Sequence, residues 1–249
     1  HPSPQTHALP PGPQRRPDDS PRHVLVTGAP RSGTSLLYNM LCYAYPRYGN
    51  TIGEHFATKA FAQPGDWISK NPFDLQSVEK LDQLAKLAGK ELHTLCMLRA
   101  PRDVVTRFME SRGGYFFSFE HYPNRAGEQV AGLLEFYEWL EAALRSDADF
   151  ATIQYELLVR NPYGIQQLIG NLIGEEGERA FSMCHTSEKP LGMPKDDQKC
   201  KLKVSTEWIG RWRKPEHKER ILEQFKSKDR REMLIEYGYE RTDEWYYWL

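Results

Sequence analysis

Eight consecutive residues near the start of the chain combine small, hydroxyl-bearing and basic side chains in a way that suits anion binding. The segment Gly28-Ala29-Pro30-Arg31-Ser32-Gly33-Thr34-Ser35 follows the apolar run Val24–Val26 and precedes an apolar stretch from Leu36 to Ala44. This pattern predicts a strand, a tight turn and a helix whose N-terminal N–H groups and dipole favour an anion. The hydroxyl groups of the turn add donors, and the Arg31 guanidinium offers a planar fork for phosphate or sulfate oxygens. We therefore expect an anion site here rather than an ordinary turn.

The spacing of the two glycines narrows the kind of anion. Gly28 and Gly33 are separated as in the Walker A pattern G-x-x-x-x-G-K-[ST], but Thr34 stands where that pattern requires lysine. The basic residue comes three positions earlier, at Arg31. A bound triphosphate with Mg²⁺ normally needs that lysine and an acidic group on a neighbouring strand, so the loop argues against a kinase or an ATPase.

A second basic segment follows the apolar run His93–Leu98, which predicts a buried parallel strand. It reads Arg99-Ala100-Pro101-Arg102-Asp103-Val104-Val105. An arginine at the end of this strand cannot hold Mg²⁺, but it can bind a second phosphate. Two separated phosphate sites without a metal-binding carboxylate suit a nucleotide that bears phosphates at both its 5′ and its 3′ positions.

The rest of the chain predicts the elements that position these two segments. Apolar runs that read as strands alternate with helices that have one apolar face, and Asp74 is a suitable N-cap for one of these helices. Besides the two strands already named, the expected elements are strands at Trp67–Lys70 and Phe150–Tyr155, and helices after Asp74, over Glu128–Arg145, from Pro162 and over Glu207–Tyr237. This order favours an α/β fold with a P-loop-type, mainly parallel sheet flanked by helices and a helical C-terminal region. The aromatic segment Gly113–Asn124 reads equally as a pocket wall or as a hydrophobic loop on the core.

Composition sets the wider limits. The 249 residues are expected to form a disordered, Pro-rich tail over 1–22 and a single domain over 23–249. A net charge of −1 gives no support for a nucleic-acid partner. Because no apolar run approaches the roughly 18–20 residues of a membrane span, we expect none. The expected location is cytoplasmic, or the Golgi lumen if an N-terminal anchor precedes residue 1.

The four cysteines have no zinc-binding spacing, and we expect no metal. Cys42 and Cys96 lie in apolar contexts typical of core thiols. Cys184 and Cys200 flank a loop-like segment, and their pairing in an oxidising compartment stays open.

Taken together, the two anion-binding segments resemble those of sulfotransferases that use 3′-phosphoadenosine 5′-phosphosulfate (PAPS). The loop Gly28–Ser35 resembles the family's 5′-phosphosulfate loop, and the segment Leu98–Val105 resembles its 3′-phosphate segment. Further matches follow in the same order at Ser69–Phe73, Gln154–Leu158 and Ser205–Trp212. The order and spacing are most similar to tyrosylprotein, Golgi-type and bacterial sulfotransferases, and the resemblance covers Val24 to Tyr239.

The resemblance implies roles for individual residues. Arg31, Ser32, Gly33, Thr34 and Ser35 would hold the 5′-phosphosulfate, Arg99 the 3′-phosphate, and Tyr155 would lie near the adenine. Arg31 and Lys70 would neutralise charge near the transferring sulfuryl group, and Glu54 would be the general base. His55 is the rival base. Lys201 and Lys203 would belong to a loop that closes over the cofactor.

One position departs from the family pattern. Arg107 stands where the family usually has a serine that contacts the 3′-phosphate. An arginine can still bind phosphate there, or it can be an ordinary solvated helix residue.

The implied reaction transfers a sulfuryl group from PAPS to a hydroxyl-bearing acceptor, which can be a small molecule, a sugar or a protein tyrosine. A P-loop kinase or phosphotransferase, and a non-catalytic nucleotide-binding protein on the same fold, are the alternatives. A homodimer stays open.

Overall fold

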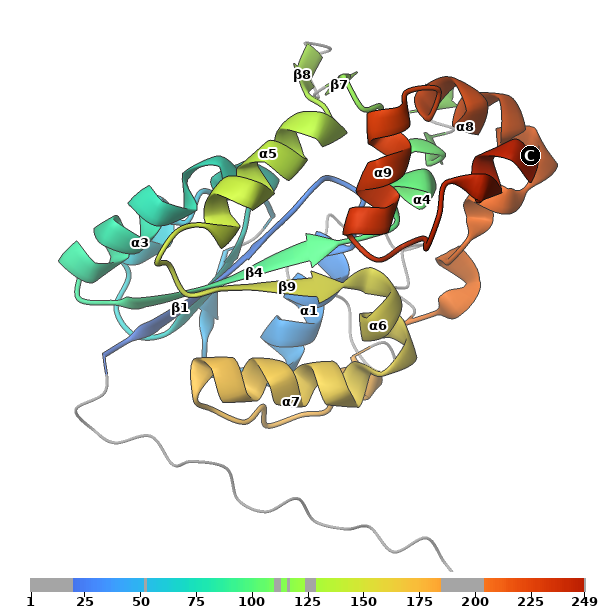
Figure 1. The fold of residues 1–249 in the computed structure, drawn as a ribbon. Helices are drawn as coiled ribbons and strands as arrows, with labels where there is room; N and C mark the ends of the chain where they lie inside the picture. The colour runs from blue at the N-terminus through green and yellow to red at the C-terminus, as the bar shows by residue number, and fades with distance from the viewer. Residues whose placement is uncertain are drawn as a thin grey trace, which may run out of the picture.

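A parallel β-sheet forms the centre of the molecule (Figure 1). The computed structural model describes residues 20–51, 53–109, 113–115, 117–123, 129–184 and 204–248. The five strands of this sheet lie in the order β2-β3-β1-β4-β9, and each neighbouring pair is parallel. Their bounds are β1 Arg22–Thr27, β2 Gly49–Asn50, β3 Trp67–Lys70, β4 Glu91–Leu98 and β9 Phe150–Gln154. Two antiparallel pairs lie outside it, formed by β5 Phe108–Met109 with β6 Gly114–Tyr115 and by β7 His121–Pro123 with β8 Gln129–Ala131.

Helices cover both faces of the sheet. In Figure 1, α3 and α5 lie over one face, and α1, α6 and α7 lie over the other. Helices α4, α8 and α9 gather beyond the carboxyl ends of the strands. The α-helices are α1 Thr34–Ala44, α2 Thr58–Phe61, α3 Val78–Leu87, α4 Pro101–Val105, α5 Leu133–Leu144, α6 Tyr155–Arg160, α7 Pro162–Ile173, α8 Lys218–Gln224 and α9 Lys228–Glu236. The 3-10 helices are η1 Pro72–Ser77, η3 Phe181–Met183, η5 Thr206–Trp208, η6 Arg211–Arg213, η7 Pro215–His217 and η8 Glu244–Trp248.

The central strands are buried on both faces, which explains their continuous apolar sequences. On β1, Val24 and Val26 pack into the cluster that includes α1 and α7, whereas Leu25 packs into the cluster with α3. Cys96 of β4 lies in a third cluster with α5 and the C-terminal helices. The predicted α/β fold with a parallel sheet flanked by helices is therefore confirmed, because helices cover both faces of the sheet.

Three predicted helices differ from the observed ones. The helix predicted after Asp74 begins at Val78, because Pro72–Ser77 forms a 3-10 helix. The helix predicted from Glu128 begins only at Leu133, because Gln129–Ala131 pairs with β7 as a strand. The helix predicted over Glu207–Tyr237 is divided into 3-10 turns, α8 and α9, with Gly210 in a left-handed conformation and Pro215 opening a new turn. Helical periodicity on a charged segment did not show these interruptions.

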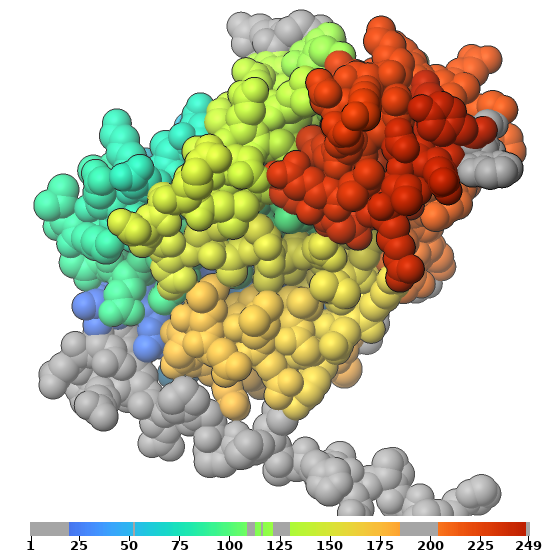
Figure 2. All heavy atoms as spheres, viewed as in Figure 1, coloured from blue at the N-terminus to red at the C-terminus, as the bar shows by residue number. Residues whose placement is uncertain are grey.

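The C-terminal helices pack as one block against α5. Figure 2 shows this block in orange and red beside the lime segment of α5. Its contacts with α5 include the rings of Tyr137 and Tyr237, whose centroids lie 4.5 Å apart, and a 2.6 Å hydrogen bond from the Tyr237 hydroxyl to Glu141 Oε1. Trp245, from the aromatic C-terminal end of the chain, packs on Trp212 and on Phe225. The block thereby places η5 and η6 at the carboxyl edge of the sheet.

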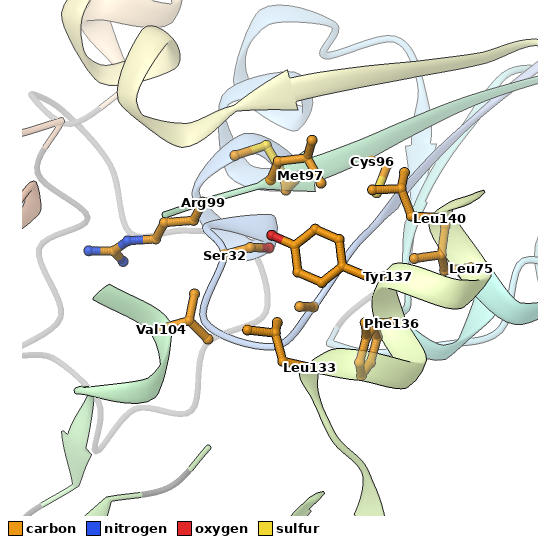
Figure 3. A pocket seen from close by; sticks show the side chains of 12 residues that line it. Ser32, Leu75, Cys96, Met97, Arg99, Val104, Leu133, Phe136, Tyr137 and Leu140 are labelled. Carbon is orange, nitrogen blue, oxygen red and sulfur yellow. The ribbon is translucent and has the colours of Figure 1, made fainter. Parts of the chain in front are cut away.

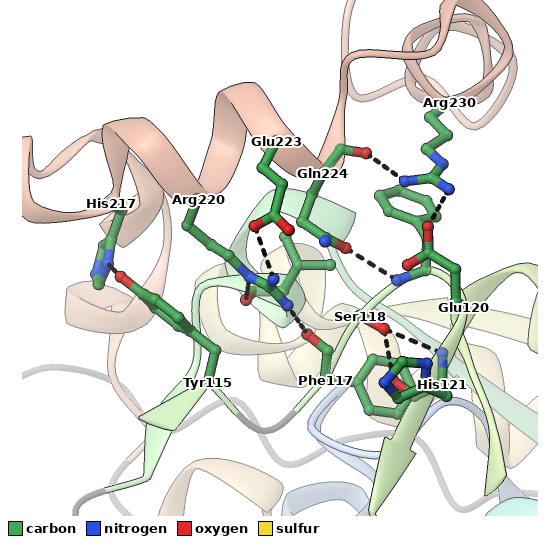
Figure 4. A network of polar contacts seen from close by, with 12 residues as sticks. Tyr115, Phe117, Ser118, Glu120, His121, His217, Arg220, Glu223, Gln224 and Arg230 are labelled. Atoms are coloured by element: carbon green, nitrogen blue, oxygen red, sulfur yellow. Dashed lines mark hydrogen bonds and ion pairs between the residues drawn. The ribbon is translucent and has the colours of Figure 1, made fainter. Parts of the chain in front are cut away.

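The described part of the aromatic segment belongs mainly to the core. Phe117 and Phe119 are fully buried. Figure 4 shows how α8 holds this segment: Arg220 donates to the Phe117 carbonyl at 2.9 Å, and Gln224 Oε1 accepts from the Phe119 N–H at 3.0 Å. These two phenylalanines therefore belong to the hydrophobic core and do not form a pocket wall.

Most of the predicted N-terminal tail, residues 1–19, lies outside the described residues. Arg22, which the prediction assigned to that tail, is the first residue of β1. Cys42 and Cys96 are buried, as expected of core thiols. The pairing of Cys184 with Cys200, which the sequence left open, involves a cysteine outside the described part. No helix among the described residues has the length and apolar character needed to cross a membrane.

Candidate functional site

The loop between β1 and α1 has the backbone geometry of an anion cradle. Gly28 and Gly33 both have a positive φ, 121° and 108°, and the first turn of α1 leaves N–H groups without intrahelical acceptors. A Cβ at Gly28 would lie 2.4 Å from the Met97 carbonyl oxygen of β4, so only glycine fits there. Arg31 is the only non-glycine residue with a positive φ, 71°, in the part of the chain that the structure describes. Such strain concentrates at functional loops.

A lysine from the neighbouring strand reaches this loop. Lys70 is the last residue of β3, which pairs in parallel with β1 so that Lys70 lies opposite Val26. Its ammonium donates to Ser35 Oγ at 3.0 Å and to Glu54 Oε1 at 3.0 Å. The side chain is only 8% exposed, while that of Glu54 is 51% exposed. The structure thus brings Ser35, Lys70 and Glu54 together, with the carboxylate open to solvent.

The segment that carries Glu54 is held in place by two hydrogen bonds that its own backbone N–H groups donate. The His55 N–H donates to the Lys70 carbonyl at 3.1 Å, and the Ala57 N–H donates to Asp74 Oδ2 at 2.8 Å. Asp74 is therefore not the helix N-cap that the sequence suggested; Asn71 caps η1, and its side chain accepts from the Phe73 N–H. Burial raises the pKa of Asp74 to about 6.

Arg99 lies on the other side of the loop. It follows β4, and β4 pairs with β1 on the side opposite to β3. Its guanidinium donates to the Arg31 carbonyl at 3.3 Å and to the Trp208 carbonyl at 2.6 Å. It also lies 4.3 Å from the centre of the Tyr155 ring, a cation–π contact. The strand order therefore places Lys70 and Arg99 on opposite flanks of one loop.

Further arginines gather around Arg99. Arg107 and Arg211 lie 4.5 Å and 4.2 Å from the centre of the Trp208 ring. Burial lowers the pKa of Arg107, and repulsion from Arg31, Arg99 and Arg211 lowers it further. Since arginine stays protonated in proteins, these four like charges share one region and favour a multiply charged anion.

Tyr155 forms the floor between the two flanks. A Cβ at Gly33 would lie 2.7 Å from the Tyr155 ring, so the loop rests directly on this aromatic side chain. Burial raises the pKa of Tyr155. The neighbouring Glu156 accepts from the Ala100 N–H at 3.0 Å and thereby fixes the turn that follows Arg99.

Not every predicted site residue faces this region. The hydroxyl of Ser32 is buried and points behind the loop toward Tyr137, as Figure 3 shows, and the Ser32 N–H already donates to the Ala29 carbonyl at 3.1 Å. Thr34 is buried as well, whereas Arg31 and Ser35 are exposed. Lys201 and Lys203 lie outside the described residues.

Sequence reasoning missed Arg211 and the Trp208 ring as parts of the site. Both belong to the segment Ser205–Trp212, which had matched the family pattern. Asp103 accepts from the N–H groups of Gly210, at 2.7 Å, and Trp212, at 3.1 Å, and so holds this segment against α4. The matched segment contains Trp208 and Arg211, but the sequence analysis assigned no role to either side chain. Within the described part of the chain, no group of three or more His, Cys, Asp and Glu side chains could hold a metal ion.

Comparison with known proteins defines the fold. The chain matches no protein-family model and none of the curated proteins. Among solved structures, the sulfotransferase domain of the Synechococcus PCC 7002 olefin synthase aligns with a TM-score of 0.50 and 14% identity, covering 80% of this chain and 90% of that chain. The sulfotransferase domain from the curacin biosynthetic pathway aligns with a TM-score of 0.46 and 12% identity, over 68% and 79% of the two chains. Mouse sulfotransferase SULT7A1, complexed with PAP, aligns with a TM-score of 0.47 and 16% identity, over 87% and 89%.

The first of these structures is similar enough to show that this chain has a sulfotransferase fold. The resemblance predicted from the sequence is thereby confirmed at the level of the fold.

Proposed function

We propose that the chain is a sulfotransferase that moves a sulfuryl group from PAPS to an acceptor hydroxyl. The observation that carries this proposal is the pair of cationic flanks on one anion loop, with Lys70 on one side and the Arg99 group on the other. A donor with a 5′-phosphosulfate and a 3′-phosphate presents two separate anionic groups. Such a donor matches two cationic flanks better than a single triphosphate chain does.

The residues present fit this donor chemically. The N–H groups at the start of α1, the Ser35 hydroxyl and Lys70 would hold the 5′-phosphosulfate. Arg99, Arg107 and Arg211 would hold the 3′-phosphate, since guanidinium groups bind phosphate through paired hydrogen bonds. In this arrangement Arg107 replaces the hydroxyl contact that a serine would give.

The reaction needs one base and one stabilising cation. PAPS supplies the sulfuryl group. The acceptor oxygen forms a bond to the sulfur while the bond between the sulfur and the bridging oxygen breaks, and 3′,5′-adenosine bisphosphate (PAP) is released. Glu54 takes the proton of the acceptor hydroxyl, because its carboxylate is the exposed acid beside the loop. Lys70 holds the Glu54 carboxylate in place and stabilises the negative charge that grows on the leaving oxygen. Alignment and charge stabilisation together account for most of such catalysis.

The test combines binding with turnover. Calorimetry with PAP measures the nucleotide site, and a panel of phenols, sugars and peptides with labelled PAPS, followed by mass spectrometry, measures transfer. We expect Glu54→Gln to bind PAP as the wild type does and to lose about 100-fold or more of the transfer rate. Full transfer by Glu54→Gln removes Glu54 as the base, and His55→Gln then tests the rival. An absence of PAP binding overturns the proposal, while PAP binding without transfer to any acceptor favours a non-catalytic nucleotide-binding protein.

A further inference from the structure

The hydroxyl of Ser32 is buried behind the anion loop and has no hydrogen-bond partner among the described residues. The residue is 1% exposed, and Ser32 Oγ makes no hydrogen bond within the described part of the chain. A buried hydroxyl without a hydrogen-bond partner is unfavourable. This hydroxyl therefore requires a partner that the described residues do not supply directly.

A second hydroxyl points toward it from α5. In Figure 3, the phenol of Tyr137 reaches across the space behind the loop, and its oxygen points toward Ser32. Both residues line the same cavity, whose other walls are apolar side chains such as Leu75, Val104 and Leu140. The Tyr137 ring is fixed by its contact with the ring of Tyr237, 4.5 Å away. Its hydroxyl is thus held at the edge of an otherwise apolar space.

Arg99 also lines this cavity, but its guanidinium points away from the Ser32 and Tyr137 oxygens (Figure 3). The two hydroxyl groups are therefore the polar groups that face one another across the space. The cavity volume is about 20 Å³, and one water molecule needs about 10–15 Å³ and two to four polar partners. The two hydroxyl groups and this volume therefore suffice for one water molecule behind the anion loop.

We propose that this cavity is a binding site for ordered water, which bridges Ser32 Oγ to the Tyr137 hydroxyl. Tyr137 is then a positioning residue: it contacts no reacting atom, but it fixes the anion loop from behind through Ser32. Loss of the Tyr137 hydroxyl loosens this loop.

Hydrogen exchange of the ligand-free protein tests this link without reference to any activity. Tyr137→Phe keeps the ring and removes only the hydroxyl. We expect the loop amides, including the Ser32 N–H that donates to Ala29, to exchange about three- to tenfold faster in this variant. Tyr237→Phe is the matched control, because it removes a hydroxyl from the adjoining ring that bonds Glu141 and does not line the cavity. Equal exchange in Tyr137→Phe and wild type, or equal acceleration by both variants, overturns the proposal.

A second measurement separates this proposal from the proposed function. If the chain binds PAP, on which this readout rests, Tyr137→Phe and Ser32→Ala are each expected to weaken binding about three- to tenfold, and the double variant no more than either single one. Additive losses contradict a shared water. If the wild type does not bind PAP, the proposed function fails, while exchange and a high-resolution crystal structure still decide the inference. Water within hydrogen-bonding distance of Ser32 Oγ and the Tyr137 oxygen supports it, and a dry cavity overturns it.

Discussion

Asp74 allows a quantitative test of how the segment with Glu54 is held. Its carboxylate is 2% exposed and accepts the Ala57 N–H at 2.8 Å, three residues after Glu54. Burial raises the pKa of Asp74 from 3.8 to about 6, with the Ala57 hydrogen bond acting in the opposite direction. Each pKa unit corresponds to about 1.4 kcal/mol, so ionisation of the buried group costs about 3 kcal/mol of folding stability.

The sign of the pH effect follows from proton binding. Between pH 4 and 6 the folded protein holds the Asp74 proton and the unfolded chain releases it. The contribution of Asp74 to the free energy of unfolding is therefore fully present below about pH 4 and is lost as the pH rises through 6. Asp74→Asn carries no such titration, and its side-chain carbonyl can still accept the Ala57 N–H.

The assay is urea unfolding followed by tryptophan fluorescence at several pH values. We expect the free energy of unfolding of Asp74→Asn, minus that of the wild type, to increase by about 2 kcal/mol between pH 4 and 7, because a small part of the effect is already lost at pH 4. Glu79→Gln, on the exposed face of α3, controls for the removal of a carboxylate as such. A difference between Asp74→Asn and wild type that stays constant across this pH range refutes the reasoning, whatever its absolute size.

Three further predictions concern the site itself. Lys70→Met is expected to lower the single-turnover transfer rate about 100- to 1000-fold, and an unchanged rate contradicts its role. Arg107→Ser is expected to weaken PAP binding about tenfold and to reduce its salt dependence in calorimetry, whereas an unchanged affinity contradicts the phosphate-binding role of Arg107. Gly33→Ala is expected to lower the melting temperature more than Gly65→Ala: both positions have a positive φ, but only the Cβ at Gly33 meets a neighbour, 2.7 Å away in the Tyr155 ring. Equal melting temperatures of the two variants contradict the close packing of the loop.

The sequence was informative where local pattern and tertiary structure agree. Continuous apolar runs such as His93–Leu98 mark strands that are covered on both faces, and β4 indeed spans Glu91–Leu98. The glycine at position 28 was informative for the same reason, because a Cβ there would lie 2.4 Å from the Met97 carbonyl oxygen and no other residue fits. Such constraints act on single residues and are visible in the sequence.

The sequence did not predict the directions in which individual side chains of the loop point. Ser32 and Ser35 have the same chemistry and lie three residues apart, yet one hydroxyl is buried behind the loop and the other accepts from Lys70. The left-handed backbone at Arg31 and Gly33 determines this division, and a motif does not encode it. Arg211 was missed because its place depends on Asp103, more than one hundred residues earlier in the chain, which binds the backbone of Gly210.

The ammonium group that a Walker A lysine would bring to the loop comes from a neighbouring strand. Thr34 stands where a Walker A lysine would stand, and the first turn of α1 therefore carries no ammonium group of its own. Lys70 supplies one from β3, because the parallel register sets it opposite Val26, at the point where β1 enters the loop. A lysine within the loop moves with the loop, whereas Lys70 is fixed by the sheet and is also bonded to Glu54. In the proposed function, this bond links the cation beside the anion directly to the carboxylate beside the acceptor, which suits a reaction that depends on alignment rather than on a metal-bound triphosphate.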